Sequence, residues 1–206
     1  MARYTGPKNR LARREGMDLG MKTVGSHAHA SLLKRLAITP GQHGQKRKRK
    51  QSNFAVQLRE KQKVKRFYGV LERQFRRYFE HAKKWKGNTG EMLLQFLERR
   101  LDNVLYRIGF APTRASARQL VSHGHVVVDG AKVDIPSFLV DAGQVISLKP
   151  KSMEMPLVKK LLEEKSFITP EWLERSGPVG KIVRLPIRTD VREDISEQLI
   201  VEHYSR

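Results

Sequence analysis

The sequence contains no cysteine, which excludes disulfide bonds, thiolate nucleophiles and the cysteine-rich signatures of zinc sites. It has no apolar run of roughly 18 residues, the length that would suggest a membrane-spanning helix, and no apolar core of signal-peptide length near Met1. These absences are typical of a soluble protein in a reducing compartment. We therefore expect a cytoplasmic location, and the stroma of a plastid stays open as an alternative.

Acidic residues are scarce relative to basic ones. The 206 residues include 21 Asp and Glu against 41 Lys and Arg, which gives a formal net charge of +20. Self-repulsion of this size opposes a compact state unless a polyanion neutralises it, and basic side chains bind nucleic acid by releasing counterions from its phosphates. Nucleic acid is therefore the expected partner. An acidic membrane is disfavoured, because no lipidation signal is present.

The positive charge is concentrated in the first half of the chain. Residues 1–50 hold 13 basic and 2 acidic residues, residues 51–100 hold 13 and 5, and the two signs nearly balance in the remainder. Hydrophobic residues make up 39% of the sequence, which is enough for packed cores in one or two domains. The N-terminal half is thus expected to provide most of the electrostatic attraction to nucleic acid.

Residues 1–50 show weak hydrophobic periodicity, and we interpret them as an irregular basic extension that becomes ordered against its partner. The segment Thr39-Pro40-Gly41-Gln42-His43-Gly44 favours a turn, because Pro fixes φ and Gly permits positive φ. The candidate RNA-binding residues of the extension are Arg3, Lys8, Arg10, Arg13, Arg14, His43, Lys46, Arg47, Lys48, Arg49 and Lys50.

Residues 51–98 follow a helical pattern, with one apolar stripe running from Val64 to Phe79. Gly69 indicates a break between two helices. The basic residues fall mainly off the stripe, so we expect them to face phosphate. These candidates are Arg59, Lys61, Lys63, Lys65, Arg66, Arg73, Arg76, Arg77, Lys83 and Lys84.

Residues 99–150 are expected to form a compact helix–helix–hairpin unit. A helical segment ends at Gly109, although the pattern leaves open whether it continues the helix before it. Thr113 is the expected N-cap of a second helix, whose polar face carries Arg114 and Arg118. Replacing both arginines is expected to weaken RNA binding without loss of stability. Asp129-Gly130 favours a type I′ hairpin turn, and residues 145–148 form a further strand.

Residues 151–206 are expected to pack back on the helical domain. Thr169-Pro170 predicts a helix start, residues 182–185 a short strand, and Ser196 the start of a terminal helix. The expected fold class is α+β, with a mainly helical N-terminal domain and its irregular basic extension, plus a small helix–helix–hairpin RNA-binding domain.

The sequence offers no catalytic constellation. Residues 177–182 contain a Gly-Lys pair without the spacing or the hydroxyl of a phosphate-binding loop, and neither a Gly-x-Ser-x-Gly elbow nor a His-Glu-x-x-His helix is present. His27, His29 and His43 lack acidic or cysteine partners at useful spacing for a metal. We expect neither an enzyme nor a metal, cofactor or small-molecule site.

Several segments resemble the bacterial and organellar family of small-subunit ribosomal protein four. They are residues 1–8, 13–16, 40–44, 57–65, 97–104 and 199–202, so the resemblance runs from end to end. Residues 99–148 resemble the small RNA-binding domain named after that family. The residues that fall on its RNA-facing region are Arg100, Thr113, Arg114, Arg118, Gln119, Ser122, His123 and Gly124.

The resemblance implies a structural protein of the small ribosomal subunit that binds a multi-helix junction in the 5′ domain of 16S rRNA and nucleates 30S assembly. It also implies small-subunit proteins five and three as neighbours, a place on the mRNA entry path and an influence on decoding accuracy. Some family members repress their own operon. Others carry a four-cysteine zinc knuckle, and the equivalent positions resemble Asn9, Ala12, Ser26 and Ser31, which implies the zinc-free branch.

Two other functions are compatible with a basic RNA-binding chain. One is an RNA-modifying enzyme that uses the small domain for targeting, and the absence of a catalytic constellation counts against it. The other is a free-standing RNA-binding regulator, which would be expected to be shorter and to lack the N-terminal extension.

Overall fold

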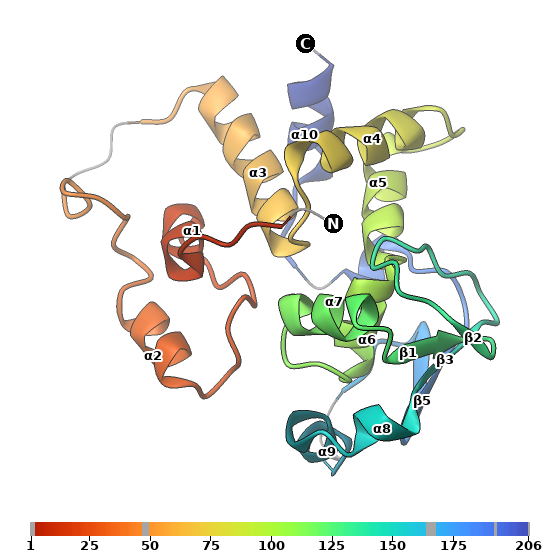
Figure 1. Cartoon of the computed structure of the whole chain (residues 1–206). Coiled ribbons are helices and arrows are strands. Elements are labelled where there is room, and N and C mark those ends of the chain that lie inside the picture. The colour runs from red at the N-terminus through yellow and green to blue at the C-terminus, as the bar shows by residue number, and fades with distance from the viewer. Residues whose placement is uncertain (1–2, 47–49, 164–167, 192, 206) are drawn as a thin grey trace. The chain divides into compact units, whose positions relative to one another are not determined.

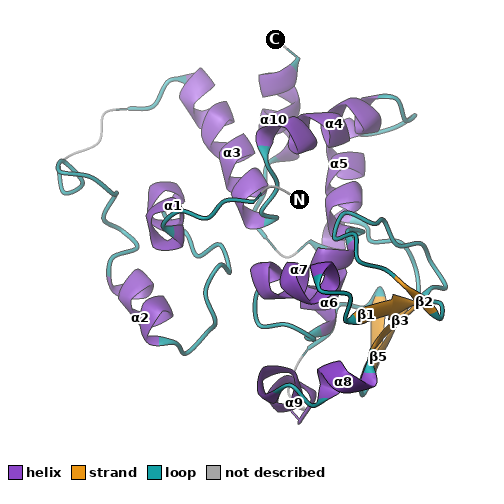
Figure 2. Ribbon diagram, in the orientation of Figure 1, coloured by secondary structure: helices purple, strands orange, loops and turns teal. Residues whose placement is uncertain are grey.

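The computed structural model describes residues 3–46, 50–163, 168–191 and 193–205 (Figure 1). It is a mixed α+β structure (Figure 2), which confirms the expected fold class. The chain divides into two compact units: unit 1 comprises Met1–Gly90 and Glu193–Arg206, and unit 2 comprises Glu91–Arg192.

Unit 1 is helical. Its elements are α1 (Lys8–Glu15), α2 (His27–Lys34), α3 (Asn53–Phe67), α4 (Glu72–Lys83), the start of α5 (Thr89–Glu98) and α10 (Glu197–Tyr204). Helix α3 begins where the Ser52 hydroxyl accepts a hydrogen bond from the Ala55 N–H at 3.3 Å. Gly69, with φ of 63°, separates α3 from α4 as predicted.

Helix α10 packs on α3, although the two are far apart in sequence. The Gln57 amide donates to the Glu202 carboxylate at 2.8 Å, and the Ser196 N–H donates to Glu60 at 2.9 Å. The ring of Tyr204 stacks on Phe79 with centroids 4.7 Å apart. The described residues 193–205 therefore pack with the helical unit.

The extension differs from the prediction of an irregular segment, because it contains α1 and α2. Ala12 of α1, Leu32 of α2 and Leu19 between the two helices are buried, which the weak periodicity did not reveal. The Ser26 hydroxyl caps α2 by accepting from the His29 N–H at 3.2 Å.

Unit 2 combines helices with a five-stranded antiparallel sheet. Its elements are α5, α6 (Leu101–Ile108), α7 (Arg114–Ser122), β1 (Val126–Val128), β2 (Ala131–Lys132), β3 (Val145–Leu148), α8 (Pro150–Met153), α9 (Pro156–Glu163), β4 (Leu173–Ser176), β5 (Val179–Ile182) and the short 3₁₀ helix η1 (Arg188–Asp190). The strand order is β2-β1-β3-β5-β4. Side chains of α6, α7 and the sheet share one core, in which Leu105, Val121 and Ile146 are fully buried.

Most local signals in unit 2 are confirmed. Asp129 (φ 48°) and Gly130 (φ 82°) both have positive φ in the turn from β1 to β2. The Thr113 hydroxyl caps α7 by accepting from the Ser116 N–H at 3.2 Å. Gly109 ends α6 with φ of 87°, and α5 and α6 are two separate helices.

The C-terminal quarter was predicted less well. Residues 169–173 do not start a helix: Leu173 begins strand β4, and the strand expected at 182–185 ends at Ile182. Trp172 is fully buried in the core of unit 2, and β5 pairs with β3 and β4. The described residues 151–163 and 168–191 thus complete the sheet unit instead of packing on the helical domain, because their apolar side chains fill its core.

Candidate nucleic-acid interface

The outer side of α4 carries a cluster of exposed cations, which we call the α4 cationic face. It consists of Arg73, Arg76, Arg77, Lys83 and Lys84. The opposite side of the helix holds Phe75 and Phe79, which are buried, so the helical period separates charge from core as predicted. Within the described residues, only Arg76 of this face forms an ion pair, with Glu80 at 3.1 Å.

Helix α1 presents a second group of cations. Arg10 and Arg14 are exposed and lie four residues apart on one side of the helix. Burial, together with repulsion from Lys22 and Arg3, lowers the pKa of Lys8 from its ordinary value. Like charges held this close favour a bound anion, because a phosphate would relieve their repulsion.

Arg13, in contrast, is part of the internal structure of the extension. Its guanidinium donates to the carbonyl oxygens of Ile38 at 2.9 Å and Thr39 at 3.3 Å. The following turn is tight: a Cβ on Gly44 would lie 2.0 Å from the Thr39 carbonyl oxygen. These contacts hold the exposed side chain of His43 at the turn.

The turn leads into the basic run, of which Lys46 and Lys50 are described and exposed. The predicted RNA-binding residues Arg47, Lys48 and Arg49 lie outside the described residues.

The cations of α3 are used largely inside unit 1. Lys61 is only 7% exposed, and its Nζ lies 2.7 Å from the carboxylate of Glu72. The prediction that Lys61 faces phosphate is therefore wrong, because its ammonium group turns toward α4 and α10. Lys65 is half-buried and also pairs with Glu72, at 2.9 Å. Burial alone would raise the pKa of Glu72, but hydrogen bonds from Lys61, Lys65 and Tyr204 lower it to about 2.

The other α3 cations are half-buried and paired. Arg59 and Arg66 both bind Glu15 of α1, the former at 3.2 Å. Burial raises the pKa of the Glu15 carboxyl in spite of these two guanidinium groups. Lys63 Nζ lies 2.7 Å from Glu60. Arg59 and Arg66 thus link α3 to α1, whereas the Lys63–Glu60 pair lies within α3; an RNA phosphate would have to compete with these carboxylate partners.

Unit 2 contains a buried arginine cluster. It comprises Arg100, Arg107, Arg114, Arg118, Glu98 and Asp102. Asp102 accepts hydrogen bonds from Arg100 at 2.8 Å and 3.1 Å, and from Arg118 at 2.6 Å and 2.8 Å. Glu98 binds Arg107 at 2.7 Å.

The burial of this cluster corrects the prediction that Arg114 and Arg118 lie on an exposed RNA-facing side of α7. They are 6% and 8% exposed, and Arg100 is fully buried. Arg114 donates to the Asn103 side chain at 2.7 Å and lies over the Tyr106 ring at 4.4 Å. The physical reason is that α6 places Asp102 and Asn103 opposite α7. Their oxygens accept hydrogen bonds from Arg118 and Arg114, so both guanidinium groups are drawn into the interior of unit 2.

The remaining candidates on α7 separate into two groups. Thr113 is buried and its hydroxyl accepts the capping hydrogen bond, so its position is explained by the fold. Gln119, Ser122 and His123 are exposed, as expected for an RNA-facing edge.

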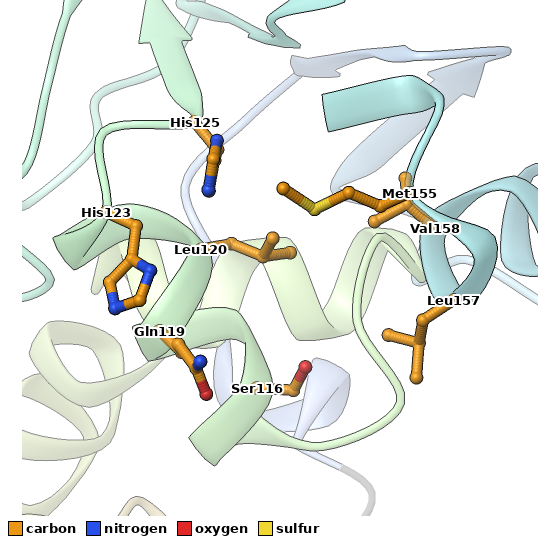
Figure 3. Close-up of a pocket in the computed structure, with 8 residues that line it drawn as sticks. All are labelled: Ser116, Gln119, Leu120, His123, His125, Met155, Leu157 and Val158. Carbon is orange, nitrogen blue, oxygen red and sulfur yellow. The ribbon is translucent and has the colours of Figure 1, made fainter. Parts of the chain in front are cut away.

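A pocket of about 200 Å³ lies beside this edge (Figure 3). Its lining residues are Ser116, Gln119, Leu120, His123, His125, Met155, Leu157 and Val158. The α7 side offers hydroxyl, amide and imidazole groups for hydrogen bonding, whereas the side formed by residues 155–158 is apolar. The apolar side of the pocket could not be predicted from the sequence, because helix α9 was not expected.

Three of the four positions that resemble a zinc knuckle have other roles, and the fourth, Ser31, is exposed. The Asn9 amide donates to the Ala28 carbonyl oxygen at 3.0 Å, Ala12 is buried, and Ser26 caps α2. Among the described residues, no group of three or more His, Cys, Asp or Glu side chains is placed to hold a metal ion. In the same residues, no helix combines the length and apolar character needed to cross a membrane.

Comparison with known proteins gives matches along nearly the whole chain. A family model described as Ribosomal protein S4/S9 N-terminal domain matches residues 3–98, and one described as S4 domain matches residues 99–146. The small ribosomal subunit protein uS4 of Thermoanaerobacter sp. (strain X514) is 55% identical over 208 residues, covering 100% of both chains. The protein of the same name from Desulfitobacterium hafniense (strain DSM 10664 / DCB-2) is 50% identical, with the same coverage.

Proposed function

Because the chain belongs to the family of small ribosomal subunit protein uS4, we propose that it is a structural constituent of the small ribosomal subunit that binds 16S rRNA. The observation that supports this best is the α4 cationic face. Its cations are exposed and, apart from Arg76, form no ion pair within the described residues, whereas those of α3 are largely neutralised by carboxylates. Phosphate groups of RNA are the natural counter-ions for such a face.

The rRNA-binding surface proposed for unit 1 joins the α4 cationic face with basic side chains of the extension, which are exposed except for half-buried Lys8. The proposed residues are Arg3, Lys8, Arg10, Arg14, His43, Lys46, Lys50, Arg73, Arg76, Arg77, Lys83 and Lys84. In unit 2 the proposed contacts are Gln119, Ser122 and His123 on the exposed edge of α7. Arg100, Arg114 and Arg118 act indirectly, by fixing α6 and α7 beneath that edge.

The finer parts of the proposal concern the place of the protein in the subunit. We propose that it binds the multi-helix junction of the 16S 5′ domain early in assembly, contacts small-subunit proteins five and three, and lies on the mRNA entry path. We further propose that it influences decoding accuracy, acts in the cytoplasm and has no catalytic activity.

Reconstitution of small subunits tests the proposal. We expect the full-length protein to co-sediment with 30S particles after a high-salt wash and to protect one junction of the 16S 5′ domain from chemical probes. Reversing charge at Arg73 and Arg77, to Glu, should reduce both signals at least tenfold, whereas a control change of Glu91 to Gln, at an exposed position of the otherwise largely buried α5, should not. Loss of the wild-type protein in the wash would contradict an integral role.

A further inference from the structure

One large aromatic side chain lies at the surface just beyond α4. Trp85 is 54% exposed, whereas the other tryptophan, Trp172, is fully buried. The backbone at Trp85 is held directly after the C-cap of the helix, because its N–H donates to the Ala82 carbonyl oxygen at 3.1 Å. The indole is thus presented to solvent from an anchored position.

Lysines surround this tryptophan in sequence. Lys83, Lys84 and Lys86 are all exposed, and none of the three forms an ion pair with a described residue. Gly87, with φ of 121°, turns the chain away toward α5. The loop therefore combines one accessible aromatic ring with three ammonium groups, and it continues the α4 cationic face.

This combination favours RNA over protein as the occupant. Aromatic residues also serve as anchors in protein–protein interfaces, but lysine is depleted there. Binding sites for single-stranded nucleic acid instead pair a cationic groove with aromatic rings on which bases stack. Double-stranded RNA keeps its bases stacked inside the helix, so a base that stacks on the indole within an RNA chain has to be unpaired.

We propose that Trp85 is a stacking platform for an unpaired RNA base, whose flanking phosphates are held by Lys83, Lys84 and Lys86. The inference rests on the proposed function in taking RNA as the ligand. It adds that unit 1 recognises a single-stranded feature, such as a bulged or loop nucleotide, as well as the phosphate backbone. No part of the electrostatic interface requires this feature, so the two can be tested separately.

Tryptophan fluorescence gives a direct readout on the full-length protein. Emission from exposed Trp85 should be quenched when a short single-stranded oligouridine or oligoadenosine is added, while Trp172 supplies a constant buried background. An RNA duplex with the same number of phosphates should quench much less, because its bases are not available for stacking. Equal quenching by both RNAs would mean a purely electrostatic contact and would overturn the proposal.

Affinity for the single strand, measured by anisotropy of a labelled oligonucleotide, separates ring stacking from hydrophobicity. Trp85→Leu should weaken binding about tenfold, within the range reported for loss of one stacked base, and Trp85→Phe should retain most of the affinity. Both variants should unfold thermally like the wild type. Equal single-strand affinity for all three proteins would overturn the proposal.

The same variants distinguish failure of this inference from failure of the proposed function. If Trp85→Leu binds single strands and the 16S 5′ domain like the wild type, the stacking site is wrong and the ribosomal role stands. If Trp85→Leu binds both RNAs like the wild type but is not incorporated into subunits in the presence of the other subunit proteins, Trp85 contacts protein. That result again overturns the stacking proposal. If the wild type does not bind the 16S domain at all, the proposed function itself is wrong.

Discussion

Replacing Arg118 with Ala should destabilise unit 2, and this reverses what the sequence suggested for that residue. Arg118 donates two hydrogen bonds to Asp102, at 2.6 Å and 2.8 Å, and the Asp102 side chain is only 2% exposed. Removing the guanidinium leaves a buried carboxylate with a single cationic partner, Arg100, which still binds it at 2.8 Å. Breaking a buried ion pair costs about 3–5 kcal/mol, and the retained partner places the expected loss near the lower end.

The magnitude translates into a clear thermal shift. For a domain of about 100 residues, 1 kcal/mol corresponds to roughly 4–8 °C, so a loss of about 3 kcal/mol lowers the Tm by roughly 12 °C or more. Trp172 is buried in unit 2, and its emission reports unfolding of that unit. Urea titrations in a Trp85→Phe background therefore give the free energy of unfolding without interference from the exposed indole.

Gln119→Ala is the matched control, because Gln119 is the next residue on α7 and is exposed. Its unfolding free energy should stay within about 0.5 kcal/mol of the wild type, as for most surface substitutions. The reasoning is refuted if Arg118→Ala is equally stable and only its RNA affinity falls. That result would mean that Arg118 leaves Asp102 in solution and binds phosphate directly.

Two further predictions concern unit 1. Because phosphate contacts release counterions, replacing all five cations of the α4 cationic face with Ala should lower the log–log salt slope of 16S rRNA binding by about 3.5–4.5 units, measured by filter binding; an unchanged slope would contradict it. Glu72 has its pKa lowered to about 2, so its contribution to stability is present above about pH 4.5 and is lost as pH falls toward 2. Because Glu72 is partly exposed, we expect Glu72→Gln to lower the unfolding free energy of unit 1 by about 1 kcal/mol at pH 7 and to reduce this acid dependence in urea titrations; identical pH profiles would contradict it.

Local signals were the most predictable part of the fold. Gly69, Gly109 and the Asp129-Gly130 turn impose backbone conformations that few other residues accept, and the structure uses each as expected. The cap at Thr113 is local in the same way, because its hydroxyl and the N–H that it binds lie within one turn.

Long-range pairing was the least predictable part. Thr169-Pro170 has the local chemistry of a helix start, but burial of Trp172 and pairing of β4 with β5 outweigh that preference. The burial of Arg118 could not be predicted from the sequence of its own helix either, because its partner Asp102 belongs to α6. The sequence of an amphipathic helix does not reveal whether a basic residue on it faces phosphate or a neighbouring carboxylate.

The packing of α10 on α3 has a consequence for the order of folding during synthesis. A nascent chain emerges from its N-terminus, so α3 leaves the exit tunnel while α10 is still unmade. All of unit 2 is translated between these two helices, and its residues Glu91–Arg192 form a continuous stretch that contains its own core. Unit 2 can therefore fold before α10 exists, and the side of α3 that α10 covers stays open until residues Glu197–Tyr204 have been made.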